Sequence, residues 1–403
     1  MTEQKENEIR FEVSGFLANG ISSGIKKDKS KDLALIYSET PAKISAVFTQ
    51  NRVKAAPVLV SMDRVKKKVA KAVIINSGNA NACTGKEGVS DAHKMANIAA
   101  KNLNIDDKLV FVASTGIIGK RLPEDRITQN IPRLIEGLSP FGIPSAAEAI
   151  LTTDTYTKIA FCKEKIGEKE VSICGIAKGS GMIMPNMATM LAFILTDAAI
   201  QTNALEEIFK EGIEGSFNSI SIDGQTSTND MAMILANGRA DNPIITRYSQ
   251  GIGRFREMVF DILLRLAKMI VKDGEGATKF VEIRVINARE YKEAKKVAFC
   301  VANSNLVKTA FWGEDCNWGR IISAIGATGV YIAADRINIW FEDALVVKDG
   351  VGTGKEQEER AQRTMKKNEF TIEIDLNNGS SKARVFTTDL SHEYININAN
   401  YRT

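Results

Sequence analysis

The amino-acid sequence predicts an α+β protein in which sheets and helices form a mixed sandwich. Short apolar segments typical of strands, and longer segments with helical periodicity, occur in both halves of the chain. Their order is not a strict alternation of strand and helix, which disfavours a doubly wound parallel sheet. The chain has 403 residues, more than one compact core usually holds. We therefore expect two lobes or two intertwined domains.

The first half is expected to begin with short strands separated by glycine- and asparagine-rich turns. Apolar residues predict strands at residues 33–37, 44–48, 58–61, 72–76 and 109–113. Helical spacing predicts two helices, the second with a proline near its start, at residues 91–103 and 123–138. Three further strands are expected at residues 158–163, 170–176 and 189–196.

The second half is expected to mix the same elements. Helices are predicted at residues 205–217, 253–271, 294–308 and 317–327. The second of these places its apolar residues on one side, as an amphipathic helix does, and Asn317 is expected to cap the last one. A strand is expected at residues 280–286. From Ile337 onward the chain is expected to be mostly strand, with one charged helix near residues 356–366.

The composition is that of an ordinary soluble globular protein, with 44% hydrophobic and 25% charged residues. No apolar run is long enough to cross a bilayer. The N-terminal residues are charged and lack the apolar core of a signal peptide, so a cytoplasmic location is predicted. The net charge of +4 is dispersed over segments of mixed sign, which does not indicate a nucleic-acid-binding surface.

Cysteine and histidine are scarce, which restricts the chemistry that the chain can carry out. The five cysteines have no paired spacing and are predicted to be free thiols, with neither a disulfide framework nor a metal site. His93 and His392 are the two histidines, and neither lies in a recognisable catalytic motif. This scarcity favours a nucleophile that needs no histidine.

One candidate nucleophile is Thr189, in the segment KGSGMIMPNMATML at residues 178–191. Glycines permit backbone turns that other residues resist, and small residues around Thr189 let its hydroxyl approach a neighbouring carbonyl. The same segment also fits a loop that leads into an apolar strand, with methionines filling gaps in the core. Its shape alone does not decide between the two interpretations.

Two further segments contain groups that could bind a substrate. Thr115 and Gly116 follow an apolar strand, and a hydroxyl beside a backbone N–H is what an oxyanion hole requires; the alternative is a plain exit from the strand. Glu275 lies between glycines after a long helix, where its carboxylate could bind an ammonium group; the alternative is an ordinary helix C-cap. No nucleotide-phosphate motif is present.

Six segments, taken together, are more specific than any one of them. They occur in this order: residues 114–119, 151–155, 178–193, 273–279, 315–320 and 394–403. In this combination the chain resembles the ornithine acetyltransferase family of bacterial arginine biosynthesis, whose members are also called glutamate N-acetyltransferases. The resemblance runs nearly from end to end.

The resemblance implies that the chain cuts itself before the threonine of its Ala-Thr-Met motif. Here that bond is Ala188–Thr189, which gives an α chain of residues 1–188 and a β chain of residues 189–403. The implied fold is of the ornithine acetyltransferase or DmpA-like type, with chemistry like that of N-terminal-nucleophile hydrolases. The implied assembly is an α2β2 heterotetramer.

The resemblance also implies a reaction: acetyl transfer from N2-acetylornithine to glutamate through an acetyl-Thr189 intermediate. Thr115 and Gly116 would form the oxyanion hole. The residues implied to bind the amino acid are Thr155, Lys178, Thr189, Glu275, Asn398 and Thr403. Glu275 suits the δ-ammonium group of ornithine, and Lys178 suits a carboxylate or the polarised acetyl group. Thr403 ends the chain, so its terminal carboxylate is expected inside the pocket.

No cofactor is implied, but some members of the family also accept acetyl-CoA, and the sequence leaves open whether this chain does. Arg402 departs from the acidic or serine-rich tail that we expected. Two alternatives to the transferase stay open. One is a related self-processing amidase or aminopeptidase that uses water as the acceptor, and the other is a non-catalytic binding protein with the same fold.

Overall fold

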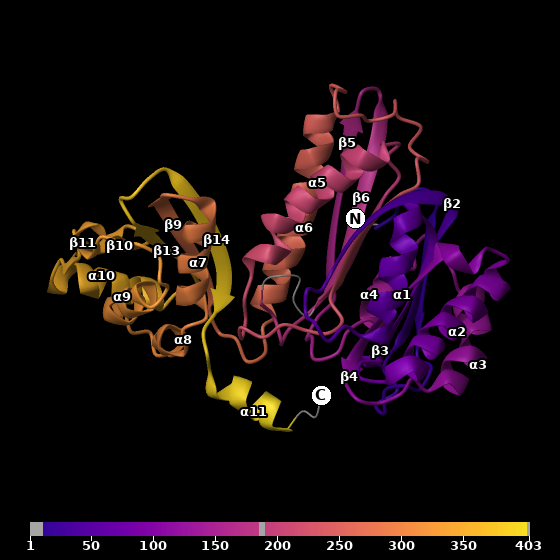
Figure 1. Cartoon of the computed structure of the whole chain (residues 1–403), viewed down its shortest axis with the longest axis horizontal. Helices are drawn as coiled ribbons and strands as arrows, with labels where there is room; N and C mark the ends of the chain where they lie inside the picture. The colour runs from indigo at the N-terminus through magenta and orange to yellow at the C-terminus, as the bar shows by residue number, and fades with distance from the viewer. Residues whose placement is uncertain (1–10, 185–189, 401–403) are drawn as a thin grey trace, which may run out of the picture.

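The structure, a computed structural model, describes residues 11–184 and 190–400. In this part of the chain, an eight-stranded and a six-stranded sheet are combined with eleven α-helices. Figure 1 shows the two sheets side by side, with the last third of the chain forming a lobe of its own. This arrangement confirms the predicted α+β architecture with two sheets.

The eight-stranded sheet contains strands from both sides of residue 189. Its strands are β1 (Phe16–Ile21), β2 (Leu33–Phe48), β3 (Val69–Asn79), β4 (Val110–Ile117), β5 (Lys158–Ile166), β6 (Lys169–Lys178), β7 (Leu191–Thr196) and β8 (Met231–Ala236). The order is β4-β3-β2-β8-β7-β6-β5, and β1 pairs with β2. Since β7 and β8 lie between β2 and β6, the segments before and after residue 189 are intertwined in one sheet.

The long strand β2 joins the two parts of this sheet. Its first residues pair with β1 and β3, and residues 43–48 pair with β8. The pairing with β3 shifts register between Tyr37 and Ala42, next to Pro41, which has no N–H for a ladder bond. Side chains from both parts of the sheet then share one core, in which Ile75 and Phe111 pack with Phe193.

Helices cover this sheet. On β2, β3 and β4 pack α1 (Ala56–Arg64), α2 (Gly85–Leu103) and α3 (Glu124–Glu136). α4 (Ile143–Ala149) packs into the core shared by both parts of the sheet, and β5 to β8 are covered by α5 (Thr202–Glu214) and α6 (Ile252–Lys272). The buried face of α6 runs from Phe255 to Ile270, as its periodicity predicts.

The six-stranded sheet has the order β12-β11-β10-β13-β9-β14. Its strands are β9 (Phe280–Ala288), β10 (Asn338–Phe341), β11 (Ala344–Lys348), β12 (Val351–Gly352), β13 (Glu369–Asp375) and β14 (Ser381–Thr388). The helices of this lobe are α7 (Tyr291–Ala302), α8 (Asn305–Trp312), α9 (Trp318–Gly326) and α10 (Lys355–Met365). After β14, α11 (His392–Asn400) reaches back toward the first sheet (Figure 1).

The prediction of a strand at residues 58–61 is wrong, because these residues lie in α1. Pro57 occupies the first turn of that helix, where its missing N–H costs nothing. Val58, Val60 and Ser61 are buried. A short apolar run fits a buried helix as well as a strand, so periodicity alone does not separate the two.

Other boundaries also differ from the expectations. The strands expected at residues 33–37 and 44–48 are one strand, β2, and the helix expected at residues 294–308 is two helices. The break falls before Ser304, whose hydroxyl accepts a bond from the N–H of Val307 and so caps α8. The last described residues form α11 where strand was expected. β1, α4 and β8 were not predicted.

The remaining expected elements are present, with shifted ends. Asn317 caps α9, its side chain accepting from the N–H of Arg320. β7 begins at Leu191, and Thr189 lies outside the described residues. Among the described helices, none combines the length and the hydropathy needed to cross a bilayer.

Candidate active site

Thr115 and Gly116 lie near the end of β4, which pairs with β3. Ser77 lies opposite Thr115, and Gly78 lies opposite Gly116. Gly116 has a φ of +130°, and a Cβ there would lie 2.4 Å from the carbonyl carbon of Gly78. Only glycine therefore fits at this position, because a side chain would force the two strands apart.

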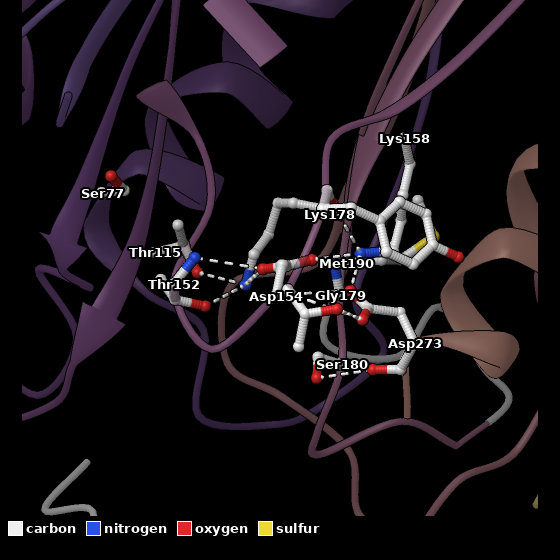
Figure 2. A network of polar contacts seen from close by, with 12 residues as sticks. Ser77, Thr115, Thr152, Asp154, Lys158, Lys178, Gly179, Ser180, Met190 and Asp273 are labelled. Atoms are coloured by element: carbon white, nitrogen blue, oxygen red, sulfur yellow. Dashed lines mark hydrogen bonds and ion pairs between the residues drawn. The ribbon is translucent and has the colours of Figure 1, made fainter. Parts of the chain in front are cut away.

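Lys178, the last residue of β6, extends its ammonium group to Thr115 (Figure 2). Its Nζ donates to the hydroxyl of Thr152 at 2.7 Å and to that of Thr115 at 3.3 Å. Only 3% of Lys178 is exposed. Burial lowers its pKa below the ordinary value, because a charged amine is poorly solvated there, and the carboxylate of Asp154 opposes this effect.

Behind Lys178 lies a buried group of two lysines and two aspartates, which we call the buried tetrad: Asp154, Lys158, Lys178 and Asp273 (Figure 2). Lys158 Nζ bonds Asp154 Oδ1 at 2.7 Å and Asp273 Oδ2 at 2.5 Å. Burial alone would raise the pKa of Asp154, but the charges of Lys178 and Lys158 outweigh it and hold that pKa well below its usual range.

Glu275 lies in the loop after α6, close to the glycine-rich segment that follows β6. Its N–H donates to the carbonyl of Ser180 at 2.9 Å. A Cβ on Gly181 would lie 2.3 Å from the Glu275 carboxylate, so a glycine at 181 is what lets this carboxylate lie against the loop. From α11, the amide of Asn398 donates to Glu275 Oε2 at 2.9 Å.

These groups share one cavity with about 600 Å³ of free space, part of it open to solvent. It is lined by Ala80, Thr115, Gly116, Ile118, Thr152, Thr153, Lys178, Gly181, Met182, Ser227, Thr228, Asn229, Glu275 and Asn398. The lining thus comes from both sides of residue 189. Lys178 contributes an ammonium group to the lining and Glu275 contributes a carboxylate. The hydroxyls of Thr115 and Thr152 lie beside the ammonium group.

Five of the residues expected in the site meet in this cavity: Thr115, Gly116, Lys178, Glu275 and Asn398. Thr155 is not among the residues that line it; its N–H and hydroxyl donate to Asp273, a member of the tetrad. Ala188, Thr189 and Thr403 lie outside the described residues. Met182, which precedes them in the chain, lines the cavity.

On the other side of Thr189, Met190 is held by a buried aspartate. Its N–H donates to Asp230 Oδ1 at 2.9 Å. Asp230 is fully buried, and burial raises its pKa well above the ordinary value. The neighbouring Asn229 lines the cavity and donates to the carbonyls of Ala80 and Ser114, which ties this wall to the strand that carries Thr115.

Sequence reasoning did not single out Thr152, Asp154, Asn229, Asp230 or Asp273. Three of these five residues lie in segments that carry the family resemblance, and the other two lie in a turn-rich segment, residues 223–230. Nothing in the local pattern says which of the polar residues in these segments face the cavity. Lys178 and Gly179, which contact Asp154, and Met190, which contacts Asp230, lie 24 to 40 residues away from these aspartates in the chain, so only the fold reveals these contacts.

The cavity between β4, β6 and the loop after α6 brings together a buried ammonium, a carboxylate and hydroxyl donors, an arrangement typical of an enzyme active site. A sequence model of the ArgJ family matches residues 17–403. The chain belongs to the ArgJ family, which confirms the resemblance seen in the sequence.

Individual relatives support this assignment. The chain is 48% identical over 391 residues to the "Arginine biosynthesis bifunctional protein ArgJ" of Geobacter sulfurreducens, a match that covers 97% of this chain and 100% of the relative.

Two solved structures are also similar. The ArgJ protein of Bacillus halodurans is 45% identical, with a TM-score of 0.42, over 44% of this chain and 92% of that one. The ornithine acetyltransferase of Mycobacterium tuberculosis, solved with ornithine, is 36% identical, with a TM-score of 0.40, over 44% of this chain and 94% of that one.

Proposed function

We propose that this protein is a glutamate N-acetyltransferase that moves an acetyl group from N2-acetylornithine to glutamate and releases ornithine and N-acetylglutamate. Its membership of the ArgJ family and the name of its Geobacter relative support a role in arginine biosynthesis. The observation that carries the proposal is the cavity, which brings together the Lys178 ammonium, the Glu275 carboxylate and Thr115.

The proposed nucleophile is Thr189, freed by self-cleavage of the Ala188–Thr189 bond. A threonine hydroxyl is a weak nucleophile and needs a base. Cleavage would give the same residue a free α-amino group, whose ordinary pKa of about 7.7–8.0 leaves a neutral fraction near pH 7. That amine can accept the hydroxyl proton, directly or through water, so no histidine is required.

In the first half-reaction, Thr189 Oγ attacks the acetyl carbonyl of acetylornithine. The amide C–N bond then breaks, and ornithine leaves with the proton that the threonine gave up. In the second, the neutral amino group of glutamate attacks the threonine ester, the C–O bond breaks, and the proton that the amine loses returns to Thr189 Oγ. We assign the oxyanion in both steps to the Thr115 hydroxyl and the Gly116 N–H, where one well-placed donor contributes about 3–4 kcal/mol.

Substrate binding would use the charges of the cavity. Glu275, oriented by Asn398, suits the δ-ammonium of ornithine, and Lys178 suits a carboxylate or the polarised acetyl oxygen. Thr155 and Thr403 stay predictions for this role. The α2β2 assembly, the cytoplasmic location and the use of acetyl-CoA as a second donor also stay predictions.

The test separates the transferase from the self-processing amidase. Purified protein is run on a denaturing gel, and N-terminal sequencing identifies the fragments. It is then given acetylornithine and glutamate, and both acetylglutamate and acetate are measured. The proposal predicts two fragments, the second beginning with Thr189, and acetylglutamate as the main product. Dominant acetate would favour the amidase, and an uncut, inactive chain would favour a binding protein. Acetyl-CoA with glutamate alone tests the second donor.

A further inference from the structure

The buried tetrad contains more charge than the proposed chemistry uses. The side chains of Asp154 and Lys158 are 0% exposed, that of Asp273 is 3% exposed and that of Lys178 is 4% exposed. Two ammonium groups and two carboxylates cancel in formal charge. Burying four ionised groups is costly even when they are paired, and a buried ion pair often adds no net stability, so stability alone does not account for their arrangement.

Asp154 is the centre of the tetrad, and its carboxylate is fixed from several sides. Oδ1 accepts from Lys158 Nζ at 2.7 Å and from the N–H of Gly179 at 2.6 Å, and Oδ2 accepts from the N–H of Thr152 at 3.0 Å. Oδ2 also lies 3.8 Å from Lys178 Nζ. Asp154 is therefore held by backbone groups next to the two residues, Lys178 and Thr152, that meet in the cavity.

Lys158 divides its ammonium between the two carboxylates of the tetrad. Besides Asp154 it bonds Asp273 at 2.5 Å, two residues before Glu275 in the chain. Lys158 itself is not among the residues that line the cavity. The tetrad thus connects the strand that ends at Lys178 to the loop that carries Glu275.

We propose that Asp154 is a positioning residue that holds the Lys178 side chain in the cavity as an ammonium ion, and that Lys158 limits this effect by sharing the same carboxylate. The inference rests on the proposed function, in which the cationic form of Lys178 is the one that binds substrate or polarises the acetyl group. Lys158 and Asp154 act through Lys178 and do not touch the substrate.

The charges around Lys178 determine what each change in the tetrad does. Asp154, Asp230 and Glu275 favour its charged form, whereas burial and the charge of Lys158 disfavour it. Lys26, from the loop after β1, is a further cation close enough to interact with it. Removing the Asp154 charge therefore lowers the pKa of Lys178, and removing the Lys158 charge raises it.

Because the two substitutions are expected to change the pKa of Lys178 in opposite directions, they separate a positioning role from a structural one. Damage to the fold by either substitution would reduce activity at every pH. A change in the pKa of Lys178 instead moves the alkaline limb of the pH profile of kcat/KM, where the ammonium loses its proton. Asp154→Asn is expected to move that limb to lower pH and Lys158→Met to higher pH.

The experiment measures acetylglutamate formation from acetylornithine and glutamate between pH 6 and 10.5 for the wild type, Asp154→Asn and Lys158→Met. An opposite charge at this range shifts a pKa by about 1–3 units. In Asp154→Asn the alkaline limb should therefore move to lower pH by about one unit or more. At pH values above that limb, kcat/KM should fall by about tenfold for each pH unit. The matched control is Asp261→Asn, on the exposed face of α6 in a surface pair with Arg265, whose profile should equal that of the wild type.

Circular dichroism and the gel assay for cleavage are run on each variant. If Asp154→Asn does not fold, the direction of the Lys158→Met shift decides alone. Shifts in the same direction, no shift, or two unfolded variants would each overturn the inference. A wild type that forms no acetylglutamate would instead overturn the proposed function, so the two failures are distinguishable.

Discussion

At the scale of single residues, the site depends on a few groups whose surroundings are unusual. Lys178 is an almost fully buried amine that is bonded to two hydroxyls and lies 3.8 Å from a carboxylate. Gly116 occupies a backbone position that admits no side chain. Lys178 lies at the end of β6 and Gly116 lies near the end of β4, two strands of the same sheet.

Thr189→Ala is expected to abolish both self-cleavage and acetyl transfer, because one hydroxyl is proposed to serve both. A denaturing gel and the acetylglutamate assay check this. Thr189→Ser keeps a hydroxyl and should retain measurable cleavage. A Thr189→Ala chain that still splits at this bond would show that the nucleophile is another group.

Thr115→Ala is expected to lower kcat by about 10²–10³-fold, the usual effect of losing one oxyanion-hole donor. KM for acetylornithine should change little, because the oxyanion exists only along the reaction path. Steady-state kinetics measure both constants, and Thr115→Ser should restore much of the rate. An effect confined to KM would assign Thr115 to substrate binding instead.

At the scale of elements, the site is assembled from loops that follow regular structure. The glycine-rich segment after β6 packs against the loop after α6, through the bond from Glu275 N–H to the Ser180 carbonyl. Asp223 accepts bonds from the N–H groups of Met182 and Ile183 and from the hydroxyl of Tyr394 in α11. One aspartate therefore ties the segment that precedes the proposed cut to the C-terminal helix.

Gly181→Ala tests this contact between loops. The new Cβ would lie 2.3 Å from the Glu275 carboxylate, so the carboxylate must move. We expect KM for acetylornithine to rise by about tenfold, equivalent to ~1.4 kcal/mol of lost binding. Gly253→Ala in α6 is the control, since nothing lies within 4 Å of its added Cβ. Equal kinetics for both variants would contradict the assigned role of Glu275.

At the scale of the whole molecule, the two proposed chains cannot be separate domains. β7 and β8 lie between β2 and β6 in one sheet, and two of the three cores packed on that sheet combine residues from before and after the proposed cut. The cavity is likewise lined by residues from before and after the proposed cut. After cleavage between residues 188 and 189, both fragments would still contribute strands to the same sheet.

We accordingly expect the two fragments to remain associated after cleavage. They should elute together in size-exclusion chromatography and separate only in denaturant, because separating them would expose the buried faces of β7 and β8 to water. The uncleaved Thr189→Ala chain is the reference for the elution volume. Fragments that separate in native buffer would contradict the shared sheet.

Much of the fold and part of the site could be predicted from sequence. The helix expected at residues 253–271 is observed as Ile252–Lys272, because its apolar face repeats over five turns. The strand expected at residues 170–176 is observed within Lys169–Lys178. The prediction from a short apolar run was wrong at residues 58–61, because so few residues do not show whether the apolar spacing is that of a helix or of a strand. Asp154 went unnoticed because Lys178 lies 24 residues away in the sequence.

The sequence by itself determined the fold class, the family and which residue types are available for chemistry, since these depend on local pattern and on ordered motifs. Only the tertiary structure decided which of those residues meet. Lys178 and Thr115 are 63 residues apart, and Thr155 and Asp273 are 118 apart. The tertiary fold brings each pair together, and burial then strengthens the hydrogen bond between its members. Local periodicity contains no record of either effect.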